Sequence, residues 1–332
     1  PRTKEYNRGL FKRIEIALGQ IRLDKLSPKH LLEFYKNLAE AGIRIDPNAE
    51  RRKEEPKNKK IKDTLSPNTI RKYHVLLHSL LEKAYKWQFI AFNPADKVEA
   101  PKVERFQKTI YDEDTLGRFL VLLDKEELKH RLMALLLINT GMRRGELFGL
   151  QWKHVDFAAG SIKIEQSSQY LIGKGVSIKA PKTESSNRTV TIPKTIIDLL
   201  KQYKAAKMAK RLKLGGIVEQ GGKWEGAKEP EDDFVFTTWN GQPAHPDSVN
   251  TWLANFIKAH DLPPITPHSF RHIAATSLIT SGTDIRTVAG KLGHANTNTT
   301  TVVYAHLLKS VEKETADIME AFLKQAADKA KK

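Results

Sequence analysis

The stretch from Thr266 to His306, TPHSFRHIAATSLITSGTDIRTVAGKLGHANTNTTTVVYAH, restricts the fold more than any other part of the chain. Thr266 followed by Pro267 is typical of a helix N-cap with proline at the first helical position. Helical spacing then predicts a buried stripe formed by Phe270, Ile273, Ala274 and Ser277. His268 and Arg271 fall off this stripe, so we expect the helix to hold both side chains pointing outward.

A second helix is predicted directly afterwards, because Ser281-Gly282 is expected to end the first. Its apolar spacing comes from Ile285, Val288, Ala289 and Leu292. Gly293 is expected as its C-terminal cap, which brings His294 to the helix end. Tyr304 stands ten positions after His294. The residues at 299–303 are all β-branched and are poor helix formers, so the segment carrying Tyr304 is predicted to be only weakly helical.

Two upstream segments complete a pattern of separated motifs. TGMRRGELFGL spans 140–150, and PKTESSNRTVTIP spans 181–193. With HxxR at 268–271, LGH at 292–294 and the later tyrosine, their order resembles the tyrosine recombinase (phage integrase) family. The pattern is most similar to integrases of temperate phages and conjugative transposons, which share the KTxxSxR hairpin and the His-to-Tyr spacing. The resemblance is good from about 110 to 308 and looser before it.

This resemblance implies a catalytic set, namely Arg143, Lys182, His268, Arg271, His294 and Tyr304. Tyr304 is the implied nucleophile, which forms a 3′-phosphotyrosine. The guanidinium groups of Arg143 and Arg271 would hold the phosphate oxygens, and Lys182 would protonate the leaving 5′ oxygen. His268 is the expected acid/base, and His294 would donate a hydrogen bond to the phosphate.

Two neighbours of Arg143 are supporting candidates. Glu146 lies one helical turn later and is expected to orient the guanidinium group, with an ordinary surface pair as the alternative. Arg144 is expected to make a phosphate or surface contact. No metal or cofactor is expected, because no acidic cluster accompanies the histidines and a tyrosine-plus-cation mechanism needs none.

The balance of charge indicates a polyanionic partner. The 332 residues include 56 Lys and Arg against 39 Asp and Glu, which gives a net charge of +17. Double-stranded DNA is the expected partner, and no membrane partner is expected because every apolar run is short. The chain has no cysteine, which excludes disulfides and thiolate metal sites. It also fits a cytoplasmic location, in a bacterial cell or the host of a phage or mobile element.

The expected fold class is mainly α with a small antiparallel β-sheet, in the two-domain architecture of tyrosine recombinases. We expect a helical core-type DNA-binding domain at 1–96, a linker at 97–108, a catalytic domain at 109–309 and a tail helix at 310–332. Because the chain begins at Pro1 inside a helical pattern, we also expect it to be part of a longer protein, in which an arm-type DNA-binding domain precedes it.

Local signals place the elements within these domains. Ser27-Pro28 and Ser66-Pro67 are predicted helix starts. The apolar faces of these two helices are predicted to include Leu31, Leu32, Phe34, Tyr35 and Leu38, and Ile70, Tyr73, Leu77, Leu80, Leu81 and Ala84. Later helices are predicted at 112–123, 128–139, 193–212 and 246–260. Alternating strands are predicted at 161–166, 176–180 and 188–192, with Lys182 at the start of the turn between the last two.

Further DNA and protein contacts are expected outside the catalytic set. Candidates for phosphate contacts lie off the apolar stripe of the helix after Ser66, although an ordinary solvated face explains them equally well: Arg71, Lys72, His74 and His78. The tail carries Val311, Ile318, Phe322 and Leu323 at amphipathic positions. In the family such a tail docks on a neighbouring protomer, which implies a homo-tetramer on DNA. Packing on its own domain is the alternative, and DNA-bending accessory proteins are a further expected class of partner.

These observations predict a site-specific DNA recombinase that integrates or excises a mobile element. The first alternative is a nicking-closing enzyme similar to type IB topoisomerases, which shares the same chemistry. The second is a DNA-binding relative that has lost catalysis, and the complete catalytic set argues against it.

Overall fold

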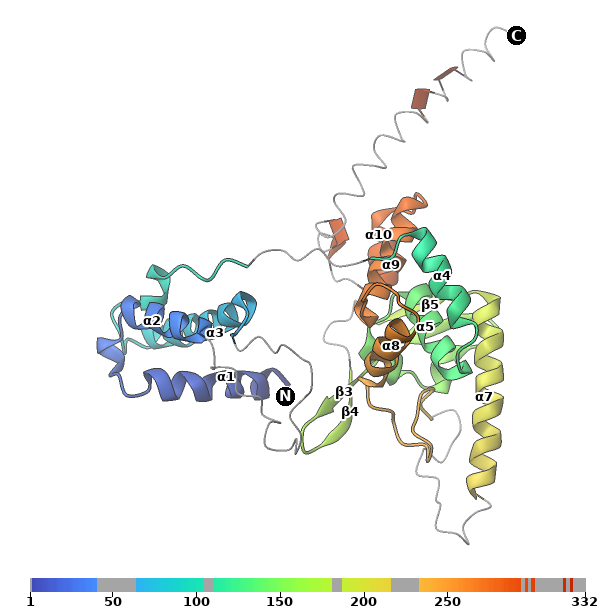
Figure 1. The fold of residues 1–332 in the computed structure, drawn as a ribbon, viewed down its shortest axis with the longest axis horizontal. Helices are drawn as coiled ribbons and strands as arrows, with labels where there is room; N and C mark the ends of the chain where they lie inside the picture. The colour runs from blue at the N-terminus through green and yellow to red at the C-terminus, as the bar shows by residue number, and fades with distance from the viewer. Residues whose placement is uncertain are drawn as a thin grey trace. The chain divides into compact units, whose positions relative to one another are not determined.

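The computed structural model describes residues 2–40, 64–103, 110–180, 187–215, 233–293, 296–297, 300–301, 319–320 and 323–324 (Figure 1). The chain divides into two compact units, an N-terminal unit at Pro1–Gln107 and a C-terminal unit at Lys108–Lys332. No helix within these ranges is both long enough and apolar enough to cross a lipid bilayer.

The N-terminal unit is all-helical. It consists of α1 (Arg2–Leu18), α2 (Pro28–Ala39) and α3 (Pro67–Lys86), with short 3-10 turns η1 (Leu23–Lys25) and η3 (Pro94–Lys97). Helices α2 and α3 begin where the Ser-Pro pairs predicted, since proline fixes the first turn and the serine caps it. The Ser66 hydroxyl, for example, accepts a hydrogen bond from the Thr69 amide at 3.2 Å.

The core of this unit is formed by one face of each helix. Its buried side chains include Leu31, Phe34, Leu38, Tyr73, Leu77 and Leu81. Leu32 and Leu80 were expected on these faces, but they are 52% and 39% exposed, so that part of the prediction is wrong. Each directly neighbours a buried leucine, and one residue along a helix turns the side chain by about 100°, away from the core. Val98, within the segment expected as a linker, is buried in this core.

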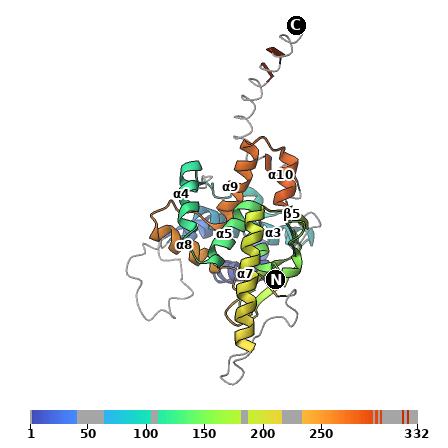
Figure 2. The ribbon, with the colours of Figure 1, turned by 90° about the vertical axis from the view of Figure 1, so that its right-hand side faces the viewer.

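The helices of the C-terminal unit include the largely apolar helix α5, which packs against several of the others. They are α4 (Glu113–Leu123), α5 (Leu128–Thr140), α6 (Arg144–Gly149), η4 (Trp152–His154), α7 (Lys194–Gly215), α8 (Ser248–Ala259), α9 (Pro267–Thr280) and α10 (Ile285–Leu292). α5 packs against α7 and α9 (Figures 1 and 2). Burial on several sides explains why the apolar residues of α5 at 132–138 are not confined to one stripe, although its first turn carries Lys129, His130 and Arg131.

The strands form two separate sheets, not the single sheet that we predicted. β1 (Val155–Asp156), β2 (Ser161–Ile164) and β5 (Arg188–Thr191) form one antiparallel sheet, in the order β1-β2-β5. β3 (Ser167–Leu171), a strand that the sequence pattern did not predict, pairs with β4 (Gly175–Lys179) as a hairpin. Gly173 and Gly175 have φ of 77° and 74° in its turn, a conformation that glycine adopts without strain. β4 and β5 therefore belong to different sheets.

Helix α9 is buried on more sides than the predicted stripe allowed. Phe270, Ile273 and Ala274 are buried as expected, but Ser277 is exposed and Arg271 is only 3% exposed. The outward orientation predicted for Arg271 is therefore wrong, whereas His268 in the first turn is exposed. The physical reason is that α9 contacts α5, α8 and α10 together, so little of its circumference faces solvent.

The last elements match the local signals where they are described. α10 ends at Gly293, which has a left-handed φ of 68° and caps the helix as predicted. Among the tail residues expected to be apolar contacts, Leu323 is 60% exposed. Val311, Ile318 and Phe322 lie outside the described residues.

Candidate active site

The site is built on the turn between α5 and α6. Gly141 ends α5 with a left-handed φ of 61°. A Cβ atom at this position would lie 2.4 Å from Cδ2 of Leu292 on α10, so both the backbone conformation and the packing require glycine. The chain then enters α6 with Arg143 as its N-cap residue. The turn that leads into Arg143 thus packs against the end of α10.

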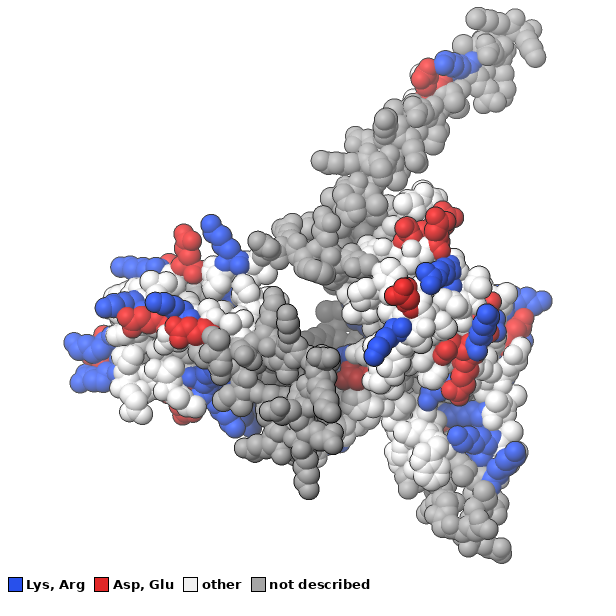
Figure 3. All heavy atoms as spheres, in the orientation of Figure 1, with Lys and Arg blue, Asp and Glu red and all other residues white. Residues whose placement is uncertain are grey.

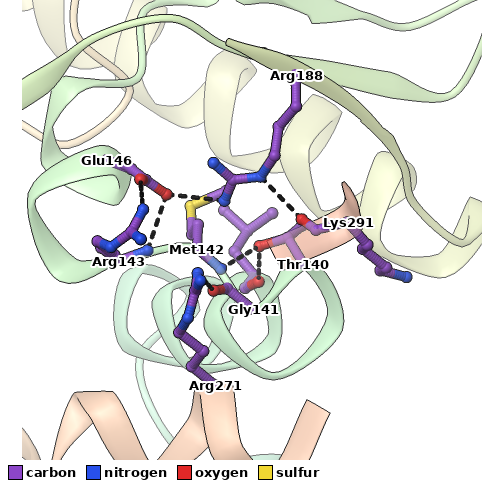
Figure 4. Close-up of polar contacts among 9 residues, drawn as sticks. Thr140, Gly141, Met142, Arg143, Glu146, Arg188, Arg271 and Lys291 are labelled. Atoms are coloured by element: carbon purple, nitrogen blue, oxygen red, sulfur yellow. Dashed lines mark hydrogen bonds and ion pairs between the residues drawn. The ribbon is translucent and has the colours of Figure 1, made fainter. Parts of the chain in front are cut away.

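Glu146 holds Arg143 at two points. The backbone amide of Arg143 donates to Oε2 of Glu146 at 2.9 Å, and its guanidinium Nη1 donates to Oε1 at 2.7 Å (Figure 4). The carboxylate side chain is 8% exposed, whereas that of Arg143 is 45% exposed. Glu146 is therefore a buried anchor rather than a member of a surface pair, and Arg143 keeps an exposed guanidinium group.

The Glu146 carboxylate stays ionised despite its burial. Burial by itself raises the pKa of Glu146, but hydrogen bonds from Arg188 and Arg143 and the positive charge of Arg188 outweigh it, so that the pKa is lowered. The group is consequently an acceptor for both guanidinium groups at neutral pH.

Arg271 is fixed from the opposite side. Its Nη1 donates to the carbonyl oxygen of Gly141 at 2.8 Å, across 130 positions of sequence (Figure 4). A guanidinium group has five N–H donors, so this bond uses only part of the hydrogen-bonding capacity of Arg271. The turn that presents Arg143 is therefore also the anchor of Arg271.

A pocket of about 320 Å³ connects the two arginine motifs. It is lined by Arg143, Arg144, Gly145, Asn250, Thr266, Pro267 and His268. The exposed ring of His268 packs edge-on against buried His272, with centroids 4.8 Å apart. Arg144 pairs with Asp247, so one candidate phosphate contact already has a carboxylate partner. The structure thus brings His268 and Arg143 to one cavity.

Arg188 is a member of this cluster that was not among the predicted site residues. It begins β5, and its Nη2 donates to Oε2 of Glu146 at 2.8 Å. Its Nε donates to the carbonyl oxygen of Lys291, also at 2.8 Å, near the end of α10. The sequence did contain a signal for Arg188, because this residue is the last of the KTxxSxR motif. Its neighbouring residues, however, do not show that the side chain turns toward the protein interior.

Three residues of the predicted catalytic set lie outside the described residues: Lys182, His294 and Tyr304. Their neighbours define where the chain enters and leaves those segments. Gly293 immediately precedes His294 and packs on Arg188, since a Cβ atom there would lie 2.8 Å from Nη1 of Arg188. Thr300, four positions before Tyr304, is fully buried. Within the described ranges, no cluster of three or more His, Cys, Asp or Glu side chains is placed to hold a metal ion.

The DNA-contact candidates of the N-terminal unit have mixed surroundings. Arg71 and Lys72 are exposed, and the ammonium group of Lys72 lies 5.5 Å from the ring centroid of Tyr6. His74 is within 3.1 Å of the Tyr35 hydroxyl, and Nε2 of His78 is 2.8 Å from Oδ1 of Asp96. The two histidines thus have partners inside the unit, while the two cationic side chains face solvent.

Comparison with known families decides the membership of this chain. Residues 110–310, which carry every motif of the candidate site, match the family described as the phage integrase family. The chain belongs to the phage integrase family. As a member it is a tyrosine-type, site-specific DNA recombinase, and nothing in these matches favours the topoisomerase-like or inactive alternatives.

Individual relatives of this phage integrase family member agree over most of its length. The ICEBs1 integrase of Bacillus subtilis (strain 168) is 27% identical over 301 residues, which cover 91% of this chain and 72% of that protein. A tyrosine recombinase XerC-like protein of Caldanaerobacter subterraneus subsp. tengcongensis is 28% identical, over 84% of this chain and 72% of that protein.

Solved structures confirm the fold. The Tn1549 transposon integrase in complex with transposon right end DNA superposes with a TM-score of 0.73 at 22% identity, covering 96% of this chain and 94% of that one. A lambda integrase dimer bound to a COC' core site gives a TM-score of 0.59 at 15% identity, covering 90% and 87%. The mainly helical fold with small antiparallel sheets is therefore that of integrases.

Proposed function

We propose that this recombinase cleaves and rejoins double-stranded DNA through a 3′-phosphotyrosine at Tyr304, and so integrates or excises a mobile element. The observation that carries the proposal is the convergence of Arg143, Arg271 and His268. Arg143 and His268 line one pocket, and Arg271 is bonded to the turn that presents Arg143. A guanidinium group that lines the cavity and a second one fixed to the same turn suit a phosphodiester whose oxygens gain charge in the transition state.

The proposed step conserves the bond energy of the DNA backbone. The Tyr304 oxygen attacks phosphorus, and its proton passes to His268 as general base. The bond from phosphorus to the 5′ oxygen breaks, and Lys182 donates a proton to that leaving oxygen. Arg143 and Arg271 stabilise the non-bridging oxygens. Attack by a 5′ hydroxyl on the phosphotyrosine reverses the step and joins the strands, and no water is consumed.

The relatives support DNA as the partner and a mobile element as the context. The names of the similar solved structures describe integrases bound to transposon-end or core-site DNA. We extend this to a homo-tetramer on two recombination sites, in which the tail at 310–332 docks on a neighbouring protomer, with DNA-bending accessory proteins and a cytoplasmic location. The 1–96 domain is proposed to contact DNA through Arg71 and Lys72.

The decisive experiment removes the attacking oxygen. Tyr304→Phe keeps the aromatic ring and should bind a duplex site normally, yet form no protein–DNA adduct that survives denaturing detergent. Tyr170→Phe is the matched control, because Tyr170 is a 42% exposed tyrosine of the same unit, on β3. This control should form the adduct at the wild-type rate. An adduct formed by Tyr304→Phe would refute the assignment of the nucleophile.

A further inference from the structure

Arg188 connects three segments of the proposed site through one buried side chain. The side chain is 6% exposed and extends from the first residue of β5, directly after the segment that carries Lys182. One edge of its guanidinium group contacts Glu146, the anchor of Arg143. Its Nε contacts the Lys291 carbonyl, three positions before His294. Figure 4 shows the group lying between these two partners.

We propose that Arg188 is a positioning residue for strand cleavage, which aligns Arg143 through Glu146 and fixes the end of α10 through Lys291. The inference rests on the function proposed above. Arg188 does not itself need to touch DNA, because its buried donors are directed at protein acceptors.

The balance of charge explains why Arg143 needs Arg188. Glu146 and Arg143 alone would form a neutral pair, in which the carboxylate cancels much of the attraction between Arg143 and a phosphate. Arg188 shares the same carboxylate at 2.8 Å, so the cluster of three groups keeps a net charge of one positive unit. A buried carboxylate with two cationic partners is also better stabilised than one with a single, half-exposed partner. The positive charge of Arg143 is then less cancelled by Glu146 and can attract a DNA phosphate.

The geometry at α10 explains why this residue is arginine. The planar group bonds in two directions at once, to the Lys291 carbonyl through Nε and to Glu146 through Nη2. Gly293 packs against it so closely that a Cβ atom would lie 3.1 Å from its Cζ atom. A lysine has a single ammonium centre and cannot span both acceptors. Arg188 therefore couples the arginine turn to the residue before His294.

The test compares single-turnover cleavage of a normal site with cleavage of a site that has a methylphosphonate at the cut position. The methyl group replaces one charged non-bridging oxygen, so this substrate depends less on Arg143. Arg188→Met should cleave the normal phosphate about 100-fold more slowly, the scale for losing one transition-state donor. The factor by which Arg188→Met slows cleavage of the methylphosphonate should be at least about tenfold smaller than the factor on the normal phosphate. Arg188→Lys should recover only part of the lost rate.

Two comparisons separate positioning from folding. Arg211→Met removes another paired arginine of the same unit, which is 19% exposed and lies 3.2 Å from Asp233, and should leave both cleavage rates within about twofold of wild type. In an Arg143→Ala background, Arg188→Met should cause a smaller further loss than it does in the wild type, because the part of its role that runs through Glu146 acts on Arg143. If Arg188→Met unfolds, as thermal unfolding would show, Glu146→Gln tests the same chain at its centre and should show the same preference for the methylphosphonate.

Equal losses on both substrates, or additive losses in the Arg143→Ala background, would overturn the positioning role. Wild-type cleavage by Arg188→Met would do so as well. Failure of the proposed function would look different, since it would appear as a covalent adduct that persists in Tyr304→Phe.

Discussion

At the scale of single residues, the site contains two arginines with different exposure. Arg143 is half-exposed and held at its base by Glu146, whereas Arg271 is buried and bonded to a backbone carbonyl. Both are fixed before any substrate arrives. Such preorganisation suits groups that stabilise developing charge, because little reorganisation remains at the moment of reaction. The proton donor for the leaving oxygen has to come from another residue type, since arginine does not give up its proton.

The first residue-scale prediction concerns that donor. Lys182→Ala should cleave ordinary DNA about 100-fold more slowly, at the lower end of the range for general acid catalysis. It should regain nearly wild-type cleavage on a substrate with sulfur at the 5′ bridging position, because a thiolate leaves without a proton. Lys174→Ala, on the β3–β4 turn of the same unit, is the control and should cleave both substrates normally. Equal defects of Lys182→Ala on the two substrates would assign Lys182 to phosphate binding instead.

A second titratable residue links stability to pH. The pKa of Lys207 is lowered to about 8, mainly by burial and also by the charges of Arg211 and Lys129, while Asp233 opposes the shift. A lysine in the unfolded chain has a pKa of about 10.4, so between about pH 8 and 10.4 the unfolded chain binds more protons than the folded one. Its contribution to the free energy of unfolding therefore rises with pH across that window.

Lys207→Met should remove this contribution. In denaturant unfolding at several pH values, the free energy of unfolding of Lys207→Met should rise with pH less steeply than that of the wild type. The difference should correspond to up to about one bound proton between about pH 8 and 10.4. Lys201→Met, an exposed position on the same helix α7, should keep the wild-type slope. An unchanged slope in Lys207→Met would mean that Lys207 is not the group responsible.

At the scale of elements, the turn between α5 and α6 contributes both to the packing of the unit and to the position of the candidate site residues. It ends α5, starts α6 and supplies the carbonyl that anchors Arg271. Leu292 of α10 packs on it, so the arginine turn and the helix leading to His294 are neighbours in space. A disturbance of this turn should therefore affect stability and cleavage together.

Gly141→Ala tests this connection. A left-handed alanine costs about 1–2 kcal/mol, and its Cβ would also collide with Leu292, so the free energy of unfolding should fall by more than that amount. Gly173→Ala is the matched control, because Gly173 has a φ of 77° and a Cβ atom added there would meet no other atom within 4 Å, so it should show the backbone cost alone. Identical losses in the two variants, measured by denaturant unfolding, would show that Leu292 yields without cost.

At the scale of the whole molecule, charge dominates the encounter with DNA. The net charge is +17, although acidic side chains lie among basic ones on the face drawn in Figure 3. On this face the described basic side chains do not form one continuous patch, so we expect the summed charge to attract DNA.

This interpretation predicts a steep salt dependence. The logarithm of the association constant for non-specific duplex should fall linearly with the logarithm of salt concentration, by about 0.9 for each neutralised phosphate. The double variant Arg71→Gln, Lys72→Gln should reduce the slope by about two if both residues contact phosphates. Lys201→Gln with Lys210→Gln, at two exposed positions on α7, is the charge-matched control and should leave the slope unchanged. A flat salt response of the wild-type protein would contradict DNA binding through charge.

Features that depend on near neighbours could be predicted from local sequence. Ser27-Pro28, Ser66-Pro67 and Thr266-Pro267 begin helices because a capping side chain and a fixed proline φ act within one turn. Gly293 ends α10 for a similarly local reason. The spacing of separated motifs was also sufficient to predict the family, since the order of residue types along a chain needs no tertiary information.

Which distant groups come into contact depends on the packing of whole elements. β4 pairs with β3 rather than β5, and the turn at Gly173 and Gly175 closes the hairpin between them. Arg271 is buried because three helices surround α9, which no period within its own sequence can show. Arg188 reaches Glu146 and Lys291 across 42 and 103 positions of sequence. Contacts of this range depend on how whole elements pack, and local residue patterns carry no information about that packing.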